Sequence, residues 1–275
     1  MLVKNNEPDV LRRNNVKVVG DSDRVMLFAH GFGCNQSMWD RVAPAFSDSY
    51  KQVMFDYVGS GQSDIRAFDP IRYSSLAGYV QDLLDVCDTL GLQSGVTFVG
   101  HSVSCNVGIL ASIARPDLFE RLILVGPNPC FLNDPPDYFG GFERSDLEDL
   151  LDLMEQNYIG WANYLAPVIS AESESGALTA ELTDSFCSTD PLTAKVFART
   201  TFFSDNRADL PKVSRPCLVI QHYEDTLAPV CVGEYVHRHI KGSTLKILDV
   251  QGHCAHMSAP ELVIDAIREY IGKSN

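Results

Sequence analysis

The sequence predicts an α/β protein in which a mostly parallel sheet carries helices on both faces and a helical segment is inserted into the chain. Apolar runs alternate with helical patterns through the first half of the chain. Several of these runs are apolar throughout, as expected of strands in a parallel sheet that is covered on both faces. The alternation stops near residue 128 and resumes near residue 212.

The first half of the chain contains five candidate strands. They are an edge strand at residues 16–19 and buried strands at residues 25–29, 52–56, 96–99 and 121–126. Residues 39–46 and 105–114 are predicted as helices between them. A further helix ends before Gly91, a residue suited to a helix C-terminus. Its apolar residues recur at helical spacing: Leu76, Val80, Leu83, Leu84, Cys87 and Leu90.

Residues 128–211 contain no convincing strand. A loop of that length without secondary structure is unusual in a compact domain, so we expect the segment to form helices of its own. Thr189-Asp190-Pro191 is typical of a helix start, with a capping side chain and a proline in the first turn. Two apolar stripes indicate further helices: Leu147, Leu150, Leu151, Met154 and Tyr158, then Leu178, Leu182 and Phe186.

The pattern of strands returns in the last part of the chain. Strands are predicted at residues 217–221 and 245–248, and Ser258 and Pro260 begin a closing helix that turns Val263, Ile267, Tyr270 and Ile271 inward. The sequence therefore predicts one core domain formed by residues 1–127 and 212–275, interrupted by a helical lid formed by residues 128–211.

Composition narrows the class of protein. The chain has 275 residues, is 45% hydrophobic and carries a net charge of -14, which argues against nucleic-acid binding and gives no basic patch for a membrane. No apolar stretch spans a bilayer, and residues 1–13 lack the apolar core of a signal peptide. We therefore expect a cytoplasmic protein, with its eight scattered cysteines reduced.

Cofactor motifs are missing from the sequence. The Gly-rich residues 56–64 lack the Lys-Ser/Thr pair of a phosphate-binding loop, and no dinucleotide spacing fits. His253 and His256 as a metal pair would need further ligands, and none lies nearby in the sequence. We therefore expect neither a cofactor nor a metal.

One short stretch carries the chemistry. The strand at residues 96–99 runs into Gly-His-Ser-Val-Ser at residues 100–104, and a helix of small residues follows. Strand, sharp turn and helix form the context of a nucleophile elbow, in which Ser102 would be lifted above the sheet edge. The usual pattern has a second glycine where this chain has Ser104, so the motif is imperfect and an incidental serine remains the alternative.

A serine needs a base and a carboxylate to become a nucleophile. Asp225 follows one late strand and His253 follows the next, and loops at the carboxyl ends of parallel strands gather together. The chain order Ser102, Asp225, His253 is the order expected of α/β-hydrolases. Glu224 and His256 are the rival acid and base. His253 is preferred because it directly follows Gly252 in the loop.

An oxyanion formed on a carbonyl substrate needs fixed donors. We expect the backbone N–H groups of Phe32 and Val103 to supply them. His30 and His101 are predicted to be structural. The direct inference is acyl transfer to water, by an esterase or lactonase that takes a small or medium-sized apolar substrate.

The sequence resembles the RsbQ-type α/β-hydrolases, bacterial regulators of the energy-stress sigma-factor pathway. The motifs that carry the resemblance lie at residues 31–34, 55–61, 133–136, 140–143, 157–161, 186–191 and 252–254. The same family resembles the plant karrikin and strigolactone receptors, which combine a hydrolase triad with signalling. The resemblance extends over nearly the whole chain and implies an α/β-hydrolase fold.

The resemblance also implies functional residues and partners. The triad would be Ser102, Asp225 and His253, the oxyanion hole Phe32 and Val103, and the ligand a small apolar ester or lactone. By the same resemblance, a PAS-domain serine phosphatase of the RsbP type would be the protein partner. The pocket would be lined from a set of lid aromatics: Phe131, Trp161, Phe197, Phe202 and Phe203. The alternatives are a metabolic carboxylesterase or lactonase without a signalling partner and, more weakly, a binding module with a vestigial triad.

Overall fold

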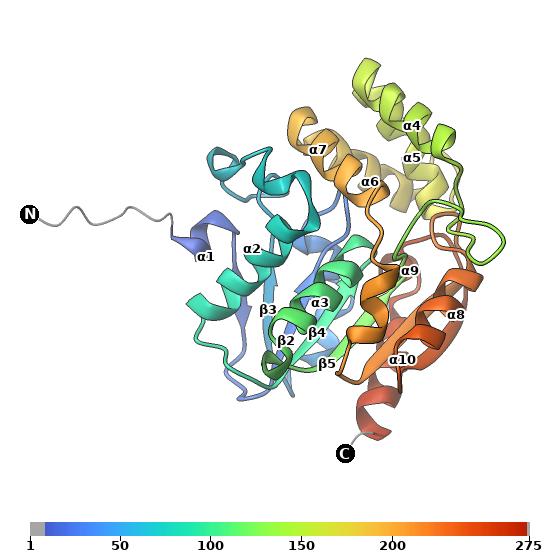
Figure 1. The fold of residues 1–275 in the computed structure, drawn as a ribbon. Coiled ribbons are helices and arrows are strands. Elements are labelled where there is room, and N and C mark those ends of the chain that lie inside the picture. Colours follow the sequence, from blue (N-terminus) through green and yellow to red (C-terminus); the bar gives the residue numbers. More distant parts are fainter. Residues whose placement is uncertain (1–8, 274–275) are drawn as a thin grey trace, which may run out of the picture.

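The computed structural model describes residues 9–273, and these form a seven-stranded sheet in the order β1-β3-β2-β4-β5-β6-β7 (Figure 1). β1 pairs with β3 in antiparallel fashion, and the other pairings among the described strands are parallel. The strands are β1 Lys17–Val19, β2 Val25–Ala29, β3 Lys51–Phe55, β4 Val96–His101, β5 Phe119–Val125, β6 Cys217–Glu224 and β7 Thr244–Gln251. Each lies where the sequence predicts a strand. Part of residues 1–13, where no signal peptide is predicted, lies outside the described residues.

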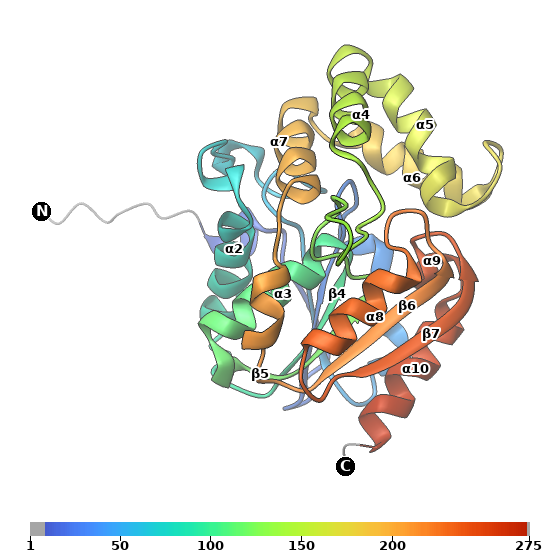
Figure 2. The same ribbon diagram turned by 45° about the vertical axis from the view of Figure 1, so that its right-hand side comes forward.

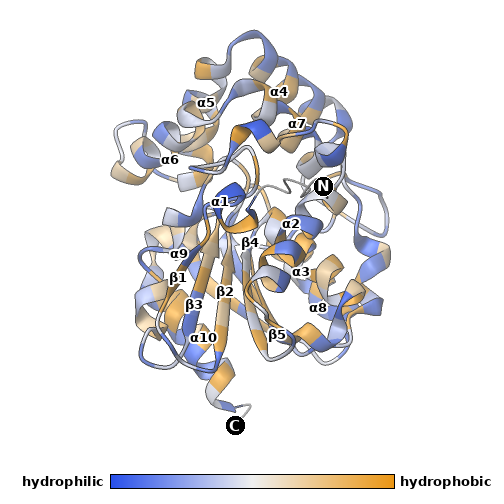
Figure 3. Ribbon diagram, turned by 90° about the vertical axis from the view of Figure 1, so that its left-hand side faces the viewer, coloured by the Kyte–Doolittle hydropathy of each residue, from blue (hydrophilic) through white to orange (hydrophobic). Residues whose placement is uncertain are grey.

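Alternate residues of the central strands face two separate layers of helices. On one face, Leu27 of β2 belongs to a core that also includes residues of α2 (Leu76–Thr89), α3 (Val103–Ala114) and α8 (Val230–His239). On the other, Phe28 belongs to a core that also includes residues of α9 (Ala255–Ser258), α10 (Pro260–Lys273) and the 3-10 helices η1 (Gln36–Trp39) and η2 (Ala43–Phe46). Figure 3 shows hydrophobic residues gathered along the central strands. None of the helices within residues 9–273 is long and apolar enough to cross a bilayer.

Between β5 and β6 the described chain forms four α-helices, which lie over one end of the sheet (Figure 2). These are α4 Arg144–Gln156, α5 Tyr158–Ser170, α6 Ala177–Ser188 and α7 Pro191–Phe202. Two of them, α4 and α6, were expected from the apolar stripes, and α7 was expected from the cap at residues 189–191. α5 was not separated from α4, although the Asn157 side chain, which accepts from the N–H of Gly160, marks its start. We call α4–α7 the helical insertion.

Other differences from the sequence prediction have local causes. The helix expected at residues 39–46 is instead the pair η1 and η2, and Pro44 lies within the second. The prediction also lacked α8 and the short α1 (Val10–Arg13). In α8 the buried stripe consists of Val232 and Val236 beside Gly233, which is a weak hydrophobic signal.

Candidate active site

Ser102 lies between the end of β4 and the start of α3, at the edge of the sheet covered by the helical insertion. Its backbone angles are φ +56° and ψ -122°, a left-handed conformation that only glycine adopts readily. Such a residue typically stores about 1–3 kcal/mol of strain. The Ser102 N–H donates to the Val125 carbonyl over 2.9 Å, which ties the turn to β5. The sharp turn that the sequence predicts is therefore present.

Asp225 and His253 lie on the loops that follow β6 and β7. His253 Nδ1 is 2.7 Å from Asp225 Oδ2, and both side chains are buried. The other carboxylate oxygen accepts the N–H groups of Leu227 at 2.9 Å and Ala228 at 3.0 Å. Burial alone would raise the pKa of Asp225, but the charge and hydrogen bond of His253 and the nearby His222 ring lower it below its ordinary value. Asp225 is thus an anion that holds the proton on His253 Nδ1.

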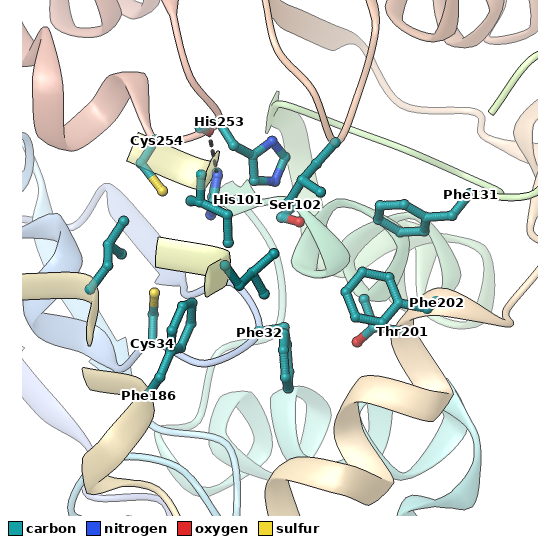
Figure 4. A pocket seen from close by; sticks show the side chains of 14 residues that line it. Phe32, Cys34, His101, Ser102, Phe131, Phe186, Thr201, Phe202, His253 and Cys254 are labelled. Atoms are coloured by element: carbon teal, nitrogen blue, oxygen red, sulfur yellow. Dashed lines mark hydrogen bonds between the residues drawn. The ribbon is translucent and has the colours of Figure 1, made fainter. Parts of the chain in front are cut away.

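The second nitrogen of His253 is free to act as a base. Nε2 is buried and has no hydrogen-bond partner within residues 9–273. The His253 ring lies beside Ser102, and both residues line the same cavity (Figure 4). The backbone of His253 is fixed at two points, because its N–H donates to Ile169 over 2.7 Å and its carbonyl lies 2.9 Å from His101 Nε2. This arrangement suits transfer of a proton from Ser102 to Nε2.

Glu224 and His256, the rival acid and base, take no part in the contact between Asp225 and His253. Glu224 is exposed and accepts from Gln251 Nε2 over 2.7 Å. The ring of His256 packs against Trp39 and His101, with centroid separations of 4.7 and 4.3 Å. Burial lowers the pKa of His256 well below its ordinary value. His256 is therefore a neutral core residue.

His222 was missed by the sequence analysis. Its side chain is fully buried, and its Nδ1 lies 3.3 Å from Asp225 Oδ2, the oxygen that also faces His253. The signal was available, because His222 precedes Asp225 by three residues at the end of a predicted strand. A second histidine beside the carboxylate adds to its electrostatic stabilisation.

The two expected oxyanion donors are unengaged. Val103 is the first residue of α3, so its N–H has no acceptor inside the helix. Phe32 lies in the loop that follows β2, and its side chain lines the same cavity as Ser102. No residue in the described part of the chain accepts from the N–H of Phe32 or Val103.

An apolar cavity adjoins Ser102 and His253 (Figure 4). Only about 20 Å³ of it is open to a water-sized sphere, roughly the room that one water molecule needs. Of the five expected lining residues, Phe131 and Phe202 are in the wall. The wall also contains residues that the sequence analysis did not select: Cys34, His101, Leu165, Ile169, Leu182, Phe186, Thr201, Leu227 and Cys254.

The other three expected pocket residues are not in the cavity wall. Trp161 lies in a layer behind it, with its ring centroid 5.9 Å from that of Phe32. Phe197 stacks on Tyr79 at 4.2 Å. Phe203 is half-buried, with the guanidinium of Arg199 5.5 Å from its ring centroid. Their aromatic character serves packing between the insertion and the core.

Two side-chain clusters bring potential metal ligands within 4.8 Å of one another. One is His222, Asp225 and His253, in which both histidine rings face the Asp225 carboxylate. The other is His101, Cys254 and His256, which the sequence analysis did not foresee. Burial raises the pKa of the Cys254 thiol well above its ordinary value and lowers that of His101, so this cluster is uncharged. Its two histidine rings pack against each other at a tilt, as is typical of a packed core.

Comparisons with known proteins agree with this geometry. Residues 24–260 match the family described as alpha/beta hydrolase fold. The chain is 38% identical to Karrikin insensitive 2 receptor CA of Petunia hybrida, over 94% of this chain and 95% of that protein. It is 40% identical to Strigolactone esterase D14 of Arabidopsis thaliana, over 94% of this chain and 97% of that protein.

A solved structure supports the same assignment. The hydrolase olei00960 from Oleispira antarctica superposes with a TM-score of 0.93 at 45% identity, covering 96% of each chain. The chain therefore belongs to the alpha/beta hydrolase fold family and is an enzyme of the carboxylic ester hydrolase class.

Proposed function

We propose that this enzyme cleaves a small apolar ester or lactone with Ser102 as nucleophile, His253 as general base and Asp225 as the carboxylate that orients it. The contact that carries the proposal is the 2.7 Å bond between His253 Nδ1 and Asp225 Oδ2, because it makes Nδ1 the donor and leaves Nε2 available as the base beside Ser102. The strained turn at Ser102 supports the same role.

The proposed reaction has two steps. Ser102 Oγ attacks the ester carbonyl carbon while its proton passes to His253 Nε2, and the N–H groups of Phe32 and Val103 bind the oxyanion. The C–O bond to the leaving group breaks as His253 returns the proton to it, which leaves an acyl-serine. Water then attacks this ester, with His253 again taking and returning the proton. Asp225 stays ionised and stabilises the imidazolium.

The cavity supports a small apolar substrate. Its wall is largely aromatic and aliphatic, and the little open space means that side chains such as Phe186 or Phe202 must shift when a ligand enters. The relatives named strigolactone esterase support a lactone-containing ligand. A butenolide ester is therefore the first substrate to test.

We also propose a signalling role of the RsbQ type, in which the enzyme acts with a PAS-domain serine phosphatase. The motif resemblance supports this role, as do relatives named as receptors. A metabolic esterase or lactonase without such a partner is the second candidate, supported by the 45% identity to a protein named only as a hydrolase, from Oleispira antarctica. Ligand-dependent binding to an RsbP-type phosphatase, measured by calorimetry, would favour the first. High turnover on many simple esters without phosphatase binding would favour the second.

The first experiment compares wild type, Ser102→Ala and His253→Ala on a synthetic butenolide ester and on p-nitrophenyl acetate. Ser112→Ala is the matched control, because Ser112 is a buried serine on α3 whose hydroxyl, within residues 9–273, bonds only to the Ile109 carbonyl. We expect intact-protein mass spectrometry to show an acyl or butenolide adduct in wild type and the control, and none in Ser102→Ala. Equal cleavage by Ser102→Ala would overturn the nucleophile assignment. Cleavage of the acetate alone would move the substrate class away from lactones.

A further inference from the structure

Ser104 occupies the place where the elbow pattern normally has glycine, and in this chain its hydroxyl is engaged. The side chain is completely buried on the first turn of α3. Its Oγ donates to the backbone carbonyl of His30 over 2.5 Å. His30 directly follows β2, which ends at Ala29, and leads into the loop that contains Phe32. Ser104 therefore connects the elbow helix to the loop of the expected oxyanion donor.

Tyr57 forms a second hydrogen bond with the Ser104 hydroxyl. Its hydroxyl oxygen is 2.8 Å from Ser104 Oγ, and it is fully buried. Because Ser104 gives its only proton to His30, Tyr57 must be the donor in this second bond. Burial raises the pKa of Tyr57, so the phenol keeps its proton. The Ser104 hydroxyl is thus held in one orientation.

The ring of His30 is fixed as well. Its Nδ1 lies 2.8 Å from the Gly31 carbonyl and must carry a proton to bond there, while Nε2 accepts the N–H of Tyr57 at 3.1 Å. Burial lowers the pKa of His30, which keeps this single tautomer. The carbonyl and both ring nitrogens of His30 therefore have partners, and two of these three contacts involve Ser104 or Tyr57.

We infer that Ser104 is a positioning residue that fixes the separation of the two oxyanion donors, the N–H groups of Phe32 and Val103. Val103 precedes Ser104 by one residue, and Phe32 follows His30 by two. The bond between Ser104 and His30 is consequently a short tie between the two backbone segments that carry the donors. A glycine at position 104 would allow the same close helix packing and would lack the tie. This inference rests on the proposed function of Ser102.

Loss of the hydrogen bond between Ser104 and His30 should lower kcat and leave KM nearly unchanged. Donors that stabilise an oxyanion act on the transition state, and loss of one donor typically lowers kcat by about 100-fold to 1,000-fold. Loosening a donor without removing it has a smaller effect, and we expect a decrease in kcat of roughly 10-fold with KM within about 2-fold.

The test uses Ser104→Ala and Ser104→Gly, with Ser112→Ala as the matched control on the same helix. Steady-state kinetics on p-nitrophenyl acetate give kcat and KM. The inhibition constant of phenylboronic acid, which forms a tetrahedral adduct on a nucleophilic serine, reports on the oxyanion site. We expect both Ser104 variants to lose about 10-fold in kcat and in boronate affinity. Ser112→Ala should match wild type, and Tyr57→Phe, which keeps the bond to His30, should lose less.

Circular dichroism melting curves separate a positioning role from loss of fold. If a Ser104 variant melts below the assay temperature, the test uses Tyr57→Phe instead. In that variant we measure the affinity for the boronate and the shifts of the Phe32 and Val103 backbone amide signals when the boronate is added. Unchanged kcat and boronate affinity in a folded Ser104→Gly would overturn the inference. So would equal losses in Ser112→Ala, or a change in KM alone. Ser102→Ala stays inactive in each of those results if the proposed function holds, and an active Ser102→Ala would instead overturn the proposed function.

Discussion

At the ends of β4, β6 and β7, Ser102, Asp225 and His253 lie on short turns held by hydrogen bonds of 2.7–3.0 Å. On the opposite side of the cavity, α5, α6 and α7 contribute apolar side chains such as Leu165, Phe186 and Phe202. The two regions meet where the N–H of His253 donates to the carbonyl of Ile169 on α5 over 2.7 Å. The polar side of the cavity is therefore set by directional bonds and the apolar side by packing.

This difference predicts different responses to substitution. A hydrogen bond between buried groups has a narrow range of geometry, so a change on the polar side should act on kcat. Apolar packing tolerates changes that conserve volume, so a change on the insertion side should act on KM or on the free energy of unfolding.

The largest effect is expected at the carboxylate. Asp225→Asn should lower kcat by about 10,000-fold, because an amide cannot stabilise the protonated His253 or hold its productive tautomer. Glu224→Gln is the matched control, since Glu224 is an exposed neighbour that contacts Gln251. Kinetics on p-nitrophenyl acetate measure both. Comparable losses in the two variants would remove Asp225 from its assigned role.

Trp161 should act on stability. The residue is completely buried behind the cavity wall, so Trp161→Ala should lower the free energy of unfolding by about 3–5 kcal/mol. Phe203→Ala, which removes a half-buried ring, should cost less than about 1 kcal/mol. Urea denaturation measures both. Unchanged stability with a selective rise in KM would place Trp161 at the ligand.

Acid should lower the free energy of unfolding through the buried histidines. Burial lowers the pKa values of His30, His101 and His256 below the ordinary 6.5. The unfolded chain then binds protons that the folded chain does not, so stability is full above pH 6.5 and falls as pH drops below it. Each such histidine contributes a slope of up to about 1.4 kcal/mol per pH unit.

His256→Phe isolates one of these histidines. Neither of its ring nitrogens has a hydrogen-bond partner within residues 9–273, so phenylalanine should fill the same space without losing a bond. The slope of unfolding free energy between pH 6.5 and 5 should decrease by about one proton, measured by urea denaturation at each pH. An unchanged slope would show that His256 is protonated in the folded chain.

The smallest effect is expected at Phe202 in the cavity wall. Phe202→Leu should raise KM for an aryl acetate by less than about 10-fold and leave kcat within about 2-fold, because it changes apolar contact alone. Phe139→Leu, at an exposed ring, is the control and should match wild type. A decrease in kcat larger than the change in KM would break the proposed separation between the two sides.

The polar side was largely predictable because its signals are local. Gly-His-Ser-Val-Ser lies at a strand–helix junction, and Asp225 and His253 each follow an apolar run, so parallel strand order brings them to one edge. His222 escaped because a histidine inside a strand end resembles a core residue. The engagement of Ser104 depends on Tyr57, 47 positions away in the sequence, so no local pattern could show it.

The apolar side was predictable as a class and not residue by residue. Helices α6 and α7 follow from spacing and capping, but α4 and α5 share a continuous apolar pattern that conceals the break at Asn157. Phe131 and Trp161 are both fully buried aromatic residues, but Phe131 borders the cavity whereas Trp161 packs against Phe32. Side-chain direction across helices depends on crossing geometry, which hydrophobic spacing does not determine.

The left-handed backbone at Ser102 lowers the stability of the fold at the residue that the proposed reaction needs. Ser102→Gly would release about 1–3 kcal/mol of strain, offset by about 0.5–1 kcal/mol of added chain entropy in the unfolded state. The hydroxyl makes no hydrogen bond that the glycine would lose within residues 9–273. A population selected for thermal tolerance alone would therefore drift toward an inactive glycine at this position. Persistence of the serine in evolving lineages would then be a direct record of selection for turnover.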